Sequence, residues 1–209
     1  MTAGGGHGRE RVVVIGGAPA TARFGRPGPD ATAGFGAPGA ELPLAPLGFG
    51  GALPPPRPPP LPLPLSLSVG RQLLDRVGWA GPTQFWAVHE AAAPAECVAL
   101  GKRLTDGPSV LLLVLGDGSG VGRNAPPGAA VAAAEPFDDA VWTALSTADA
   151  AALLRVDPVC AAELKAAGRA AWQVLAGAVE AAGGPWSASA LHRECPYGVG
   201  YFVAAWQRR

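Results

Sequence analysis

Residues 109–115 read Ser-Val-Leu-Leu-Leu-Val-Leu, and this run decides the fold class of the chain. A short apolar stretch bounded by glycine-rich flanks is typical of a strand that is buried on both faces. Strands of this kind occur in parallel sheets, because helices cover both sides of such sheets. The run therefore predicts an α/β fold in which helices flank a mostly parallel or mixed sheet.

The segments before this run continue the alternation of strands and helices. Thr83–His89 has the residue pattern of a strand, and Pro94 opens a helix that extends to Leu104. Proline is tolerated there because the first turn of a helix has no use for its missing donor. Farther upstream, Arg11–Ile15 is a β-branched run that ends at a glycine pair and predicts another buried strand. All three segments favour the same sheet.

The other predicted elements follow from local periodicity and from helix-start signals. Apolar residues spaced four apart after Pro136 predict a helix in the second half of the chain. Elsewhere the patterns predict a strand-like segment at Leu63–Val69, short helices at Arg71–Val77 and from Asp157, a helix at Ala170–Ala182, and one or two strands within Ser187–Glu194 and Val199–Trp206.

Residues 18–62 interrupt this order with a stretch that is rich in glycine and proline, and ten prolines fall between Pro43 and Pro64. Proline removes a backbone donor and fixes φ, so we expect a long, poorly ordered loop within one domain of residues 1–209. Pro54–Pro60 predicts a polyproline helix. It serves either as a stiff spacer, the favoured interpretation, or as a ligand for an aromatic groove.

The overall composition excludes several classes of protein. Lysines plus arginines and aspartates plus glutamates number 16 each, so the formal net charge is zero. This gives no basic surface for nucleic acid, and the apolar runs are too short to cross a membrane. The amino-terminal residues lack the long apolar stretch of a secretory signal, and the three cysteines are far apart. We therefore expect a cytoplasmic protein with no nucleic-acid or membrane partner.

Three residues have the types needed for a metal site with two histidines and one carboxylate, namely His89, His192 and Glu194. Residues two apart on a strand share a face, so His192 and Glu194 can converge on one ion. His89 ends another predicted strand, where open α/β sheets often bind ligands. The alternative is that all three are surface or capping residues. Cys195 as a nucleophile beside His192 is disfavoured, because residues three apart on a strand face opposite ways.

Two further segments carry candidate pocket residues. Gly116–Gly122 follows a predicted strand but matches neither the dinucleotide-binding pattern nor the P-loop pattern. We expect a rim loop in which Asp117 and Ser119 face a cleft, with a plain turn as the alternative. Tyr197 precedes Gly198, and glycine allows close backbone approach. Tyr197 is therefore a candidate pocket wall, with core packing as its alternative.

Five groups of segments carry a resemblance to a known family: Val12–Thr21, Leu63–Val69 with Leu73–Trp79, Leu113–Ser119, Ala167–Gly177 and Pro196–Trp206. In this order and spacing they resemble the class III extradiol dioxygenase-like group, related to the catalytic B subunit of protocatechuate-type ring-opening enzymes. Members of that group hold non-haem Fe(II) with two histidines and a glutamate. They leave open positions for a catechol and O₂, and a further histidine serves as acid and base.

The sequence departs from the family pattern at two expected metal histidines. It has no His-Pro-Pro-like loop, and Gly16–Pro19 stands where another metal histidine is expected. The resemblance therefore implies a degenerate or incomplete member that lacks the amino-terminal metal-ligand segment. If active, it uses Fe(II) to open the ring of an aromatic, catecholic small molecule. Otherwise it has no cofactor.

The alternative function is that of a non-enzymatic binding or scaffold protein, which uses either the residual pocket or Pro54–Pro60. A sheet that lacks the first strand of the family has an unpaired edge, and such an edge favours a homo-oligomer.

Overall fold

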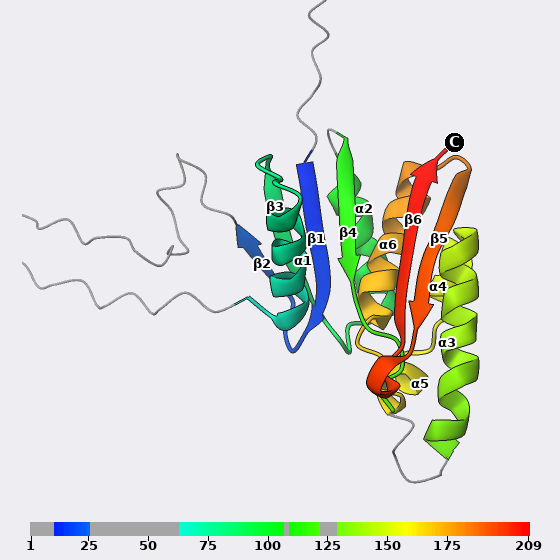
Figure 1. The fold of residues 1–209 in the computed structure, drawn as a ribbon. Coiled ribbons are helices and arrows are strands. Elements are labelled where there is room, and N and C mark those ends of the chain that lie inside the picture. The colour runs from blue at the N-terminus through cyan, green and yellow to red at the C-terminus, as the bar shows by residue number, and fades with distance from the viewer. Residues whose placement is uncertain (1–10, 26–62, 107–108, 122–128) are drawn as a thin grey trace, which may run out of the picture.

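The computed structural model describes residues 11–25, 63–106, 109–121 and 129–209, and these residues form an α/β fold (Figure 1). The fold class predicted from the sequence is confirmed, with a mixed sheet of four strands and a separate two-stranded hairpin. The Pro54–Pro60 segment lies outside the described residues. Within the described ranges, no helix is long and apolar enough to cross a membrane.

The four-stranded sheet is built around the first strand. β1 (Arg11–Ala18) lies between β3 (Thr83–His89) and β4 (Val110–Leu115), and it runs parallel to both. β2 (Ala22–Gly25) pairs with the outer edge of β3 in the antiparallel direction. The sheet order is β2-β3-β1-β4. The carboxyl ends of the three parallel strands therefore meet at one edge of the sheet.

β1 is the most buried strand because its branched side chains point to both faces of the sheet, where other elements cover them. The residues of Val12–Ile15 have no exposed surface. Val14 is in register with Phe85 of β3 and with Leu113 of β4. β4, by contrast, lies at the end of the sheet order, and Leu111 is 61% exposed. The strand predicted at residues 109–115 is confirmed, but its predicted burial on both faces is wrong because β4 is an edge strand.

Helices cover both faces of the sheet. On one face, α1 (Leu65–Arg76) packs Leu67 among the apolar residues of β1 and β3. On the other face lie α2 (Pro94–Thr105) and α6 (Arg169–Ala182). These two helices are in close contact, since a Cβ atom on Gly101 would lie 2.2 Å from the carbonyl oxygen of Val174. The helices predicted from Pro94 and over residues 170–182 are confirmed.

The remaining elements form a layer beside α6, on the β4 side of the sheet (Figure 1). Apolar side chains from some of these elements pack around Trp172 of α6, and Trp206 donates a hydrogen bond from its indole N–H to the carbonyl of Leu145 at 2.6 Å. The elements are α3 (Ala129–Thr147), α4 (Ala150–Leu154), α5 (Pro158–Glu163), β5 (Trp186–Glu194), the short 3₁₀ helix η1 (Pro196–Gly198) and β6 (Tyr201–Arg208). β5 and β6 form an antiparallel hairpin.

The structure corrects the strand-like segment predicted at Leu63–Val69. Leu65 begins α1, which also contains most of the helix predicted at Arg71–Val77. Alternating leucines fit a helix as well as a strand when residues seven apart share a helix face. Leu67 and Leu74 meet this condition, and both pack in the same apolar cluster.

Two other boundaries differ from the sequence prediction. β2 lies inside the predicted loop of residues 18–62, and β1 extends to Ala18. α3 begins at Ala129, so that Pro136 lies within the helix and not at its start. The alanine-rich turns before Pro136 have the highest helix propensity, and this outweighs the cost of one interior proline.

Candidate functional site

The carboxyl edge of the parallel strands is the place where open α/β folds usually bind ligands. β1 ends at Ala18 and β3 at His89, and β4 is followed directly by Gly116 and Asp117. The hydroxyl of Ser66, in the first turn of α1, donates a hydrogen bond to the carbonyl oxygen of Gly17 at 2.9 Å. This contact holds the start of α1 against the edge.

The segment before α6 lies directly on this edge. The backbone N–H of Gly168 donates to the carbonyl oxygen of Asp117 at 2.9 Å. A Cβ atom on Gly17 would lie 2.6 Å from the carbonyl oxygen of Ala167, and one on Gly116 would lie 2.3 Å from Cα of Gly168. Side chains are excluded at these glycines because main-chain segments are in contact. The surface at the carboxyl edge is therefore formed by backbone atoms.

Asp117 supplies an ionisable side chain at this edge. Asp117 is solvent-exposed, yet desolvation by the protein on its inner side raises the pKa of its carboxyl above the ordinary value. None of the ion pairs within the described residues involves it. An accessible carboxyl with a raised pKa, at the edge where open α/β folds usually bind ligands, is a candidate for function.

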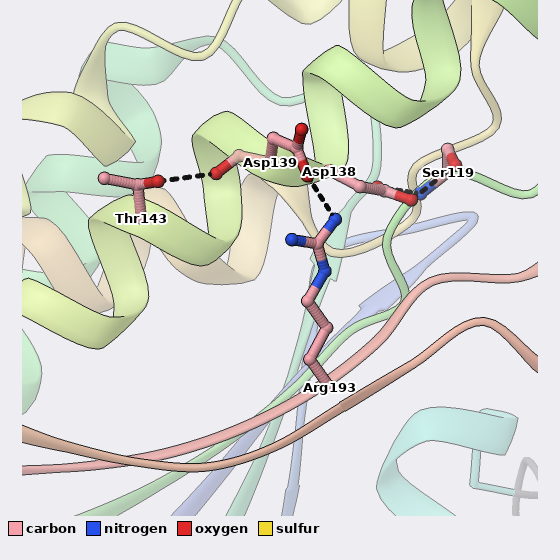
Figure 2. Close-up of polar contacts among 5 residues, drawn as sticks. All are labelled: Ser119, Asp138, Asp139, Thr143 and Arg193. Atoms are coloured by element: carbon pink, nitrogen blue, oxygen red, sulfur yellow. Dashed lines mark hydrogen bonds and ion pairs between the residues drawn. The ribbon is translucent and has the colours of Figure 1, made fainter.

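Ser119 is held inside the protein. Its backbone N–H donates to Oδ1 of Asp138 at 2.8 Å, and its hydroxyl donates to Oδ2 at 2.7 Å (Figure 2). Ser119 is 2% exposed and Asp138 is 6% exposed. Asp138 accepts hydrogen bonds from both polar groups of Ser119. Ser119 therefore joins the loop that follows β4 to α3, and it does not face a cleft as we expected.

The same loop is also joined to the hairpin. The backbone N–H of Gly118 donates to the carbonyl of Gly200 at 2.8 Å, and the N–H of Gly200 donates to the carbonyl of Ser119 at 3.0 Å. Tyr197, in the preceding turn, has a left-handed backbone with a φ of 56°, and its side chain is 100% exposed. The turn directs Tyr197 into solvent, so the structure does not place it in a pocket wall.

The predicted metal ligands come together in part. His192 Nε2 lies 3.4 Å from Glu194 Oε1 on β5, so these two residues share a face as their spacing predicts. Their neighbour Arg193 points the other way and pairs with Asp139 of α3 (Figure 2). His89, however, belongs to the four-stranded sheet, and its Nδ1 accepts a hydrogen bond from the N–H of Ala91 at 3.0 Å.

Within the described ranges, no three His, Cys, Asp or Glu side chains lie close enough together to hold a metal ion. The predicted site of His89, His192 and Glu194 is therefore not assembled, because two of its members lie on the hairpin and the third lies in a different sheet. The described donor set does not fit the Fe(II) site that the family resemblance implies.

A buried polar network that the sequence did not indicate lies close to the edge. Arg169 is 1% exposed, and its Nη1 donates to the carbonyl of Ala92 at 2.6 Å and to Oε1 of Gln173 at 3.0 Å. Its Nη2 donates to the carbonyl of Glu90. The amide of Gln173 donates in turn to the carbonyl of Val156 at 3.0 Å. One arginine thus joins the end of β3 to α6, and Gln173 joins α6 to the end of α4.

Two details show how tightly this network is enclosed. Nε of Arg169 is buried and forms no hydrogen bond within the described residues. Burial also raises the pKa of the neighbouring Cys97 thiol, although the Arg169 charge partly opposes this effect. The sequence signal for the network is a charged residue and an amide four apart within an apolar helix, where both share a face.

No protein-family model matches the chain, and neither does any curated protein.

Proposed function

We propose that this chain is a degenerate relative of the class III extradiol dioxygenases that binds a hydroxylated aromatic molecule at the carboxyl edge without opening its ring. The observation that carries the proposal is the accessible Asp117, whose carboxyl pKa is raised by desolvation. Two segments of the resemblance, Val12–Thr21 and Leu113–Ser119, end at this same edge.

The chemistry of Asp117 suits a catecholic ligand. An ionised carboxylate has two oxygens, so it can accept hydrogen bonds from both hydroxyls of a catechol. Partial removal of water raises the pKa of Asp117, and the same loss of solvent strengthens any hydrogen bond that the carboxylate accepts. Asp117 therefore binds and orients the ligand. No iron-dependent step is assigned, because the described donor set does not fit the metal.

Calorimetric titration of the full chain with catechol tests this proposal. We expect measurable binding, and we expect Asp117→Asn to weaken it roughly tenfold or more, because a hydrogen bond to a charged group is lost. The matched control is Asp75→Asn, which changes an exposed aspartate on α1. Equal affinity in wild type and Asp117→Asn, or no binding to the wild type, would overturn the proposed role of this edge.

Iron content tests the catalytic half of the proposal. Protein purified without oxygen and supplied with Fe(II) should retain well below one equivalent, and a His192→Ala, Glu194→Ala double variant should retain the same amount. Near-stoichiometric iron that is lost in the double variant, together with ring-opened product on exposure to O₂, would instead establish the dioxygenase.

A further inference from the structure

A groove of about 340 Å³ lies between α3 and the turn that joins α4 to α5. Phe137 and Val141 of α3 line it, and Ala152 and Val156 line it from the other segment. Val141 is 1% exposed, so the groove reaches the apolar interior. It shares no lining residue with the carboxyl edge, and it is therefore independent of the function proposed above.

The size and composition of the groove suit a small apolar group. Small-molecule sites are mostly apolar concavities of a few hundred cubic ångströms with a few well-placed polar groups. Here Ala140 and Ala152 contribute short side chains to the lining, which leaves space beside Phe137. An apolar side chain of aromatic size fits this description.

Two oppositely charged side chains, Arg155 and Asp157, also line the groove. Among the described residues, the carboxylate that pairs with Arg155 is that of Asp149, with Nη2 to Oδ2 at 4.0 Å in an exposed pair. Exposed pairs at such a distance are weak, so the guanidinium keeps donors for a ligand. Asp157 uses Oδ1 to accept the backbone N–H of Cys160 at 2.8 Å, and its other oxygen remains for a ligand.

We infer that this groove binds a free α-amino acid with an apolar side chain. The ligand carboxylate pairs with Arg155, the ammonium group pairs with Asp157, and the side chain occupies the apolar wall beside Phe137. A simple anion would place its charge next to Asp157, and a simple cation would place its charge next to Arg155. A zwitterion satisfies both residues, and an uncharged apolar ligand satisfies neither.

Titration of the full chain with three related ligands tests the inference. L-phenylalanine carries both charges, 3-phenylpropionate carries only the carboxylate, and phenethylamine carries only the ammonium group. We expect phenylalanine to bind roughly tenfold more tightly than either analogue, because each analogue loses one charge-assisted contact. If an analogue binds as tightly as phenylalanine, or if phenylalanine does not bind at millimolar concentration, the inference is overturned.

Substitutions then locate the site. Ala152→Leu fills the groove and should abolish binding, whereas the matched control Ala151→Leu changes an exposed residue of α4 that does not line the groove. Arg155→Gln should weaken the binding of phenylalanine but leave that of phenethylamine unchanged. If both alanine variants bind phenylalanine equally, the ligand lies elsewhere and the assignment fails.

The unaltered chain offers a second readout that does not depend on the folding of a variant. Cys160 lines the groove and is partly buried, while Cys195 is exposed and lies on the hairpin. Phenylalanine should slow the alkylation of Cys160 by iodoacetamide and leave the rate at Cys195 unchanged. Equal rates at Cys160 with and without the amino acid would contradict the site.

Discussion

Two polar pairs of this molecule differ in the way they are built. Arg169 and Gln173 lie one helical turn apart on α6 and are almost fully buried, at 1% and 0% exposed. His192 and Glu194 lie two residues apart on β5, and their side chains are 52% and 60% exposed. The first pair bonds to carbonyl groups from two other segments. Within the described residues, the ion pair found for the side chains of the second joins its two members to each other.

The chemical type of a residue pair does not indicate how firmly the structure holds it. Histidine and glutamate are the residues that catalysis and metal binding use most often, yet here they lie on an open surface. Arginine and glutamine in a sequence indicate a functional site less often, yet here burial fixes the geometry of both side chains. An exposed ion pair contributes about 0–1 kcal/mol. Removing a buried partner costs more, because groups that have lost contact with water remain unpaired.

The largest effect is expected for Arg169→Met. The variant leaves the carbonyls of Ala92 and Glu90 without their donor, and it leaves Oε1 of Gln173 without the donor that Arg169 supplies. We expect the free energy of unfolding to fall by about 3 kcal/mol, measured by urea denaturation. The control Arg103→Met, on the exposed side of α2, should change it by less than about 0.5 kcal/mol. Equal losses in the two variants would show that the buried network does not stabilise the fold.

An intermediate effect on the free energy of unfolding is expected for Ser119→Ala. Asp138 then keeps the backbone N–H of Ser119 but loses the hydroxyl, and its second oxygen stays buried without that donor. We expect a loss of about 1–2 kcal/mol, with faster amide exchange in β6 because the β4 loop also bonds to Gly200. Ser146→Ala is the control, since among the described residues that hydroxyl bonds to a carbonyl of its own helix, α3. A loss no greater than the control would refute the anchoring role.

The smallest effect is expected for His192→Ala. The pair with Glu194 is solvent-exposed, so the free energy of unfolding should change by less than about 0.5 kcal/mol. Thermal unfolding at pH 5 and at pH 8 provides the measurement. A loss above about 1 kcal/mol at either pH would mean that the hairpin pair is more constrained than its exposure indicates.

The parts of the fold that the sequence predicted are those in which local pattern and tertiary environment agree. Arg11–Ile15 and Thr83–His89 are strands as predicted, and residues 94–104 and 170–182 are helical. Leu63–Val69 was predicted to be strand-like, but it enters a helix. Its leucine spacing fits both the strand period and the helix period, and packing against the sheet selects the helix. The exposure of Leu111 depends on strand order, which no local pattern contains.

The candidate site was less predictable, because it depends on which segments meet. The spacing of His192 and Glu194 gave their shared face correctly but could not show that His89 lies in another sheet. The position of Asp117 at the carboxyl edge was predictable because loops after parallel strands gather there, and its role in binding stays a prediction. Ser119, two residues later, is paired with Asp138 of α3, and this long-range contact has no signature in the residues around either one.

The central position of β1 has a consequence for the way the chain is made. β1 is the first described strand, yet its partners β3 and β4 both follow much later in the sequence. Parallel pairing across so much chain is slow, because a long loop must close before any contact forms. While the ribosome extends the chain, the branched run Val12–Ile15 has none of these partners until residues 83–89 emerge. The strand that is most buried in the folded protein is therefore the one that stays longest without its partner strands during synthesis.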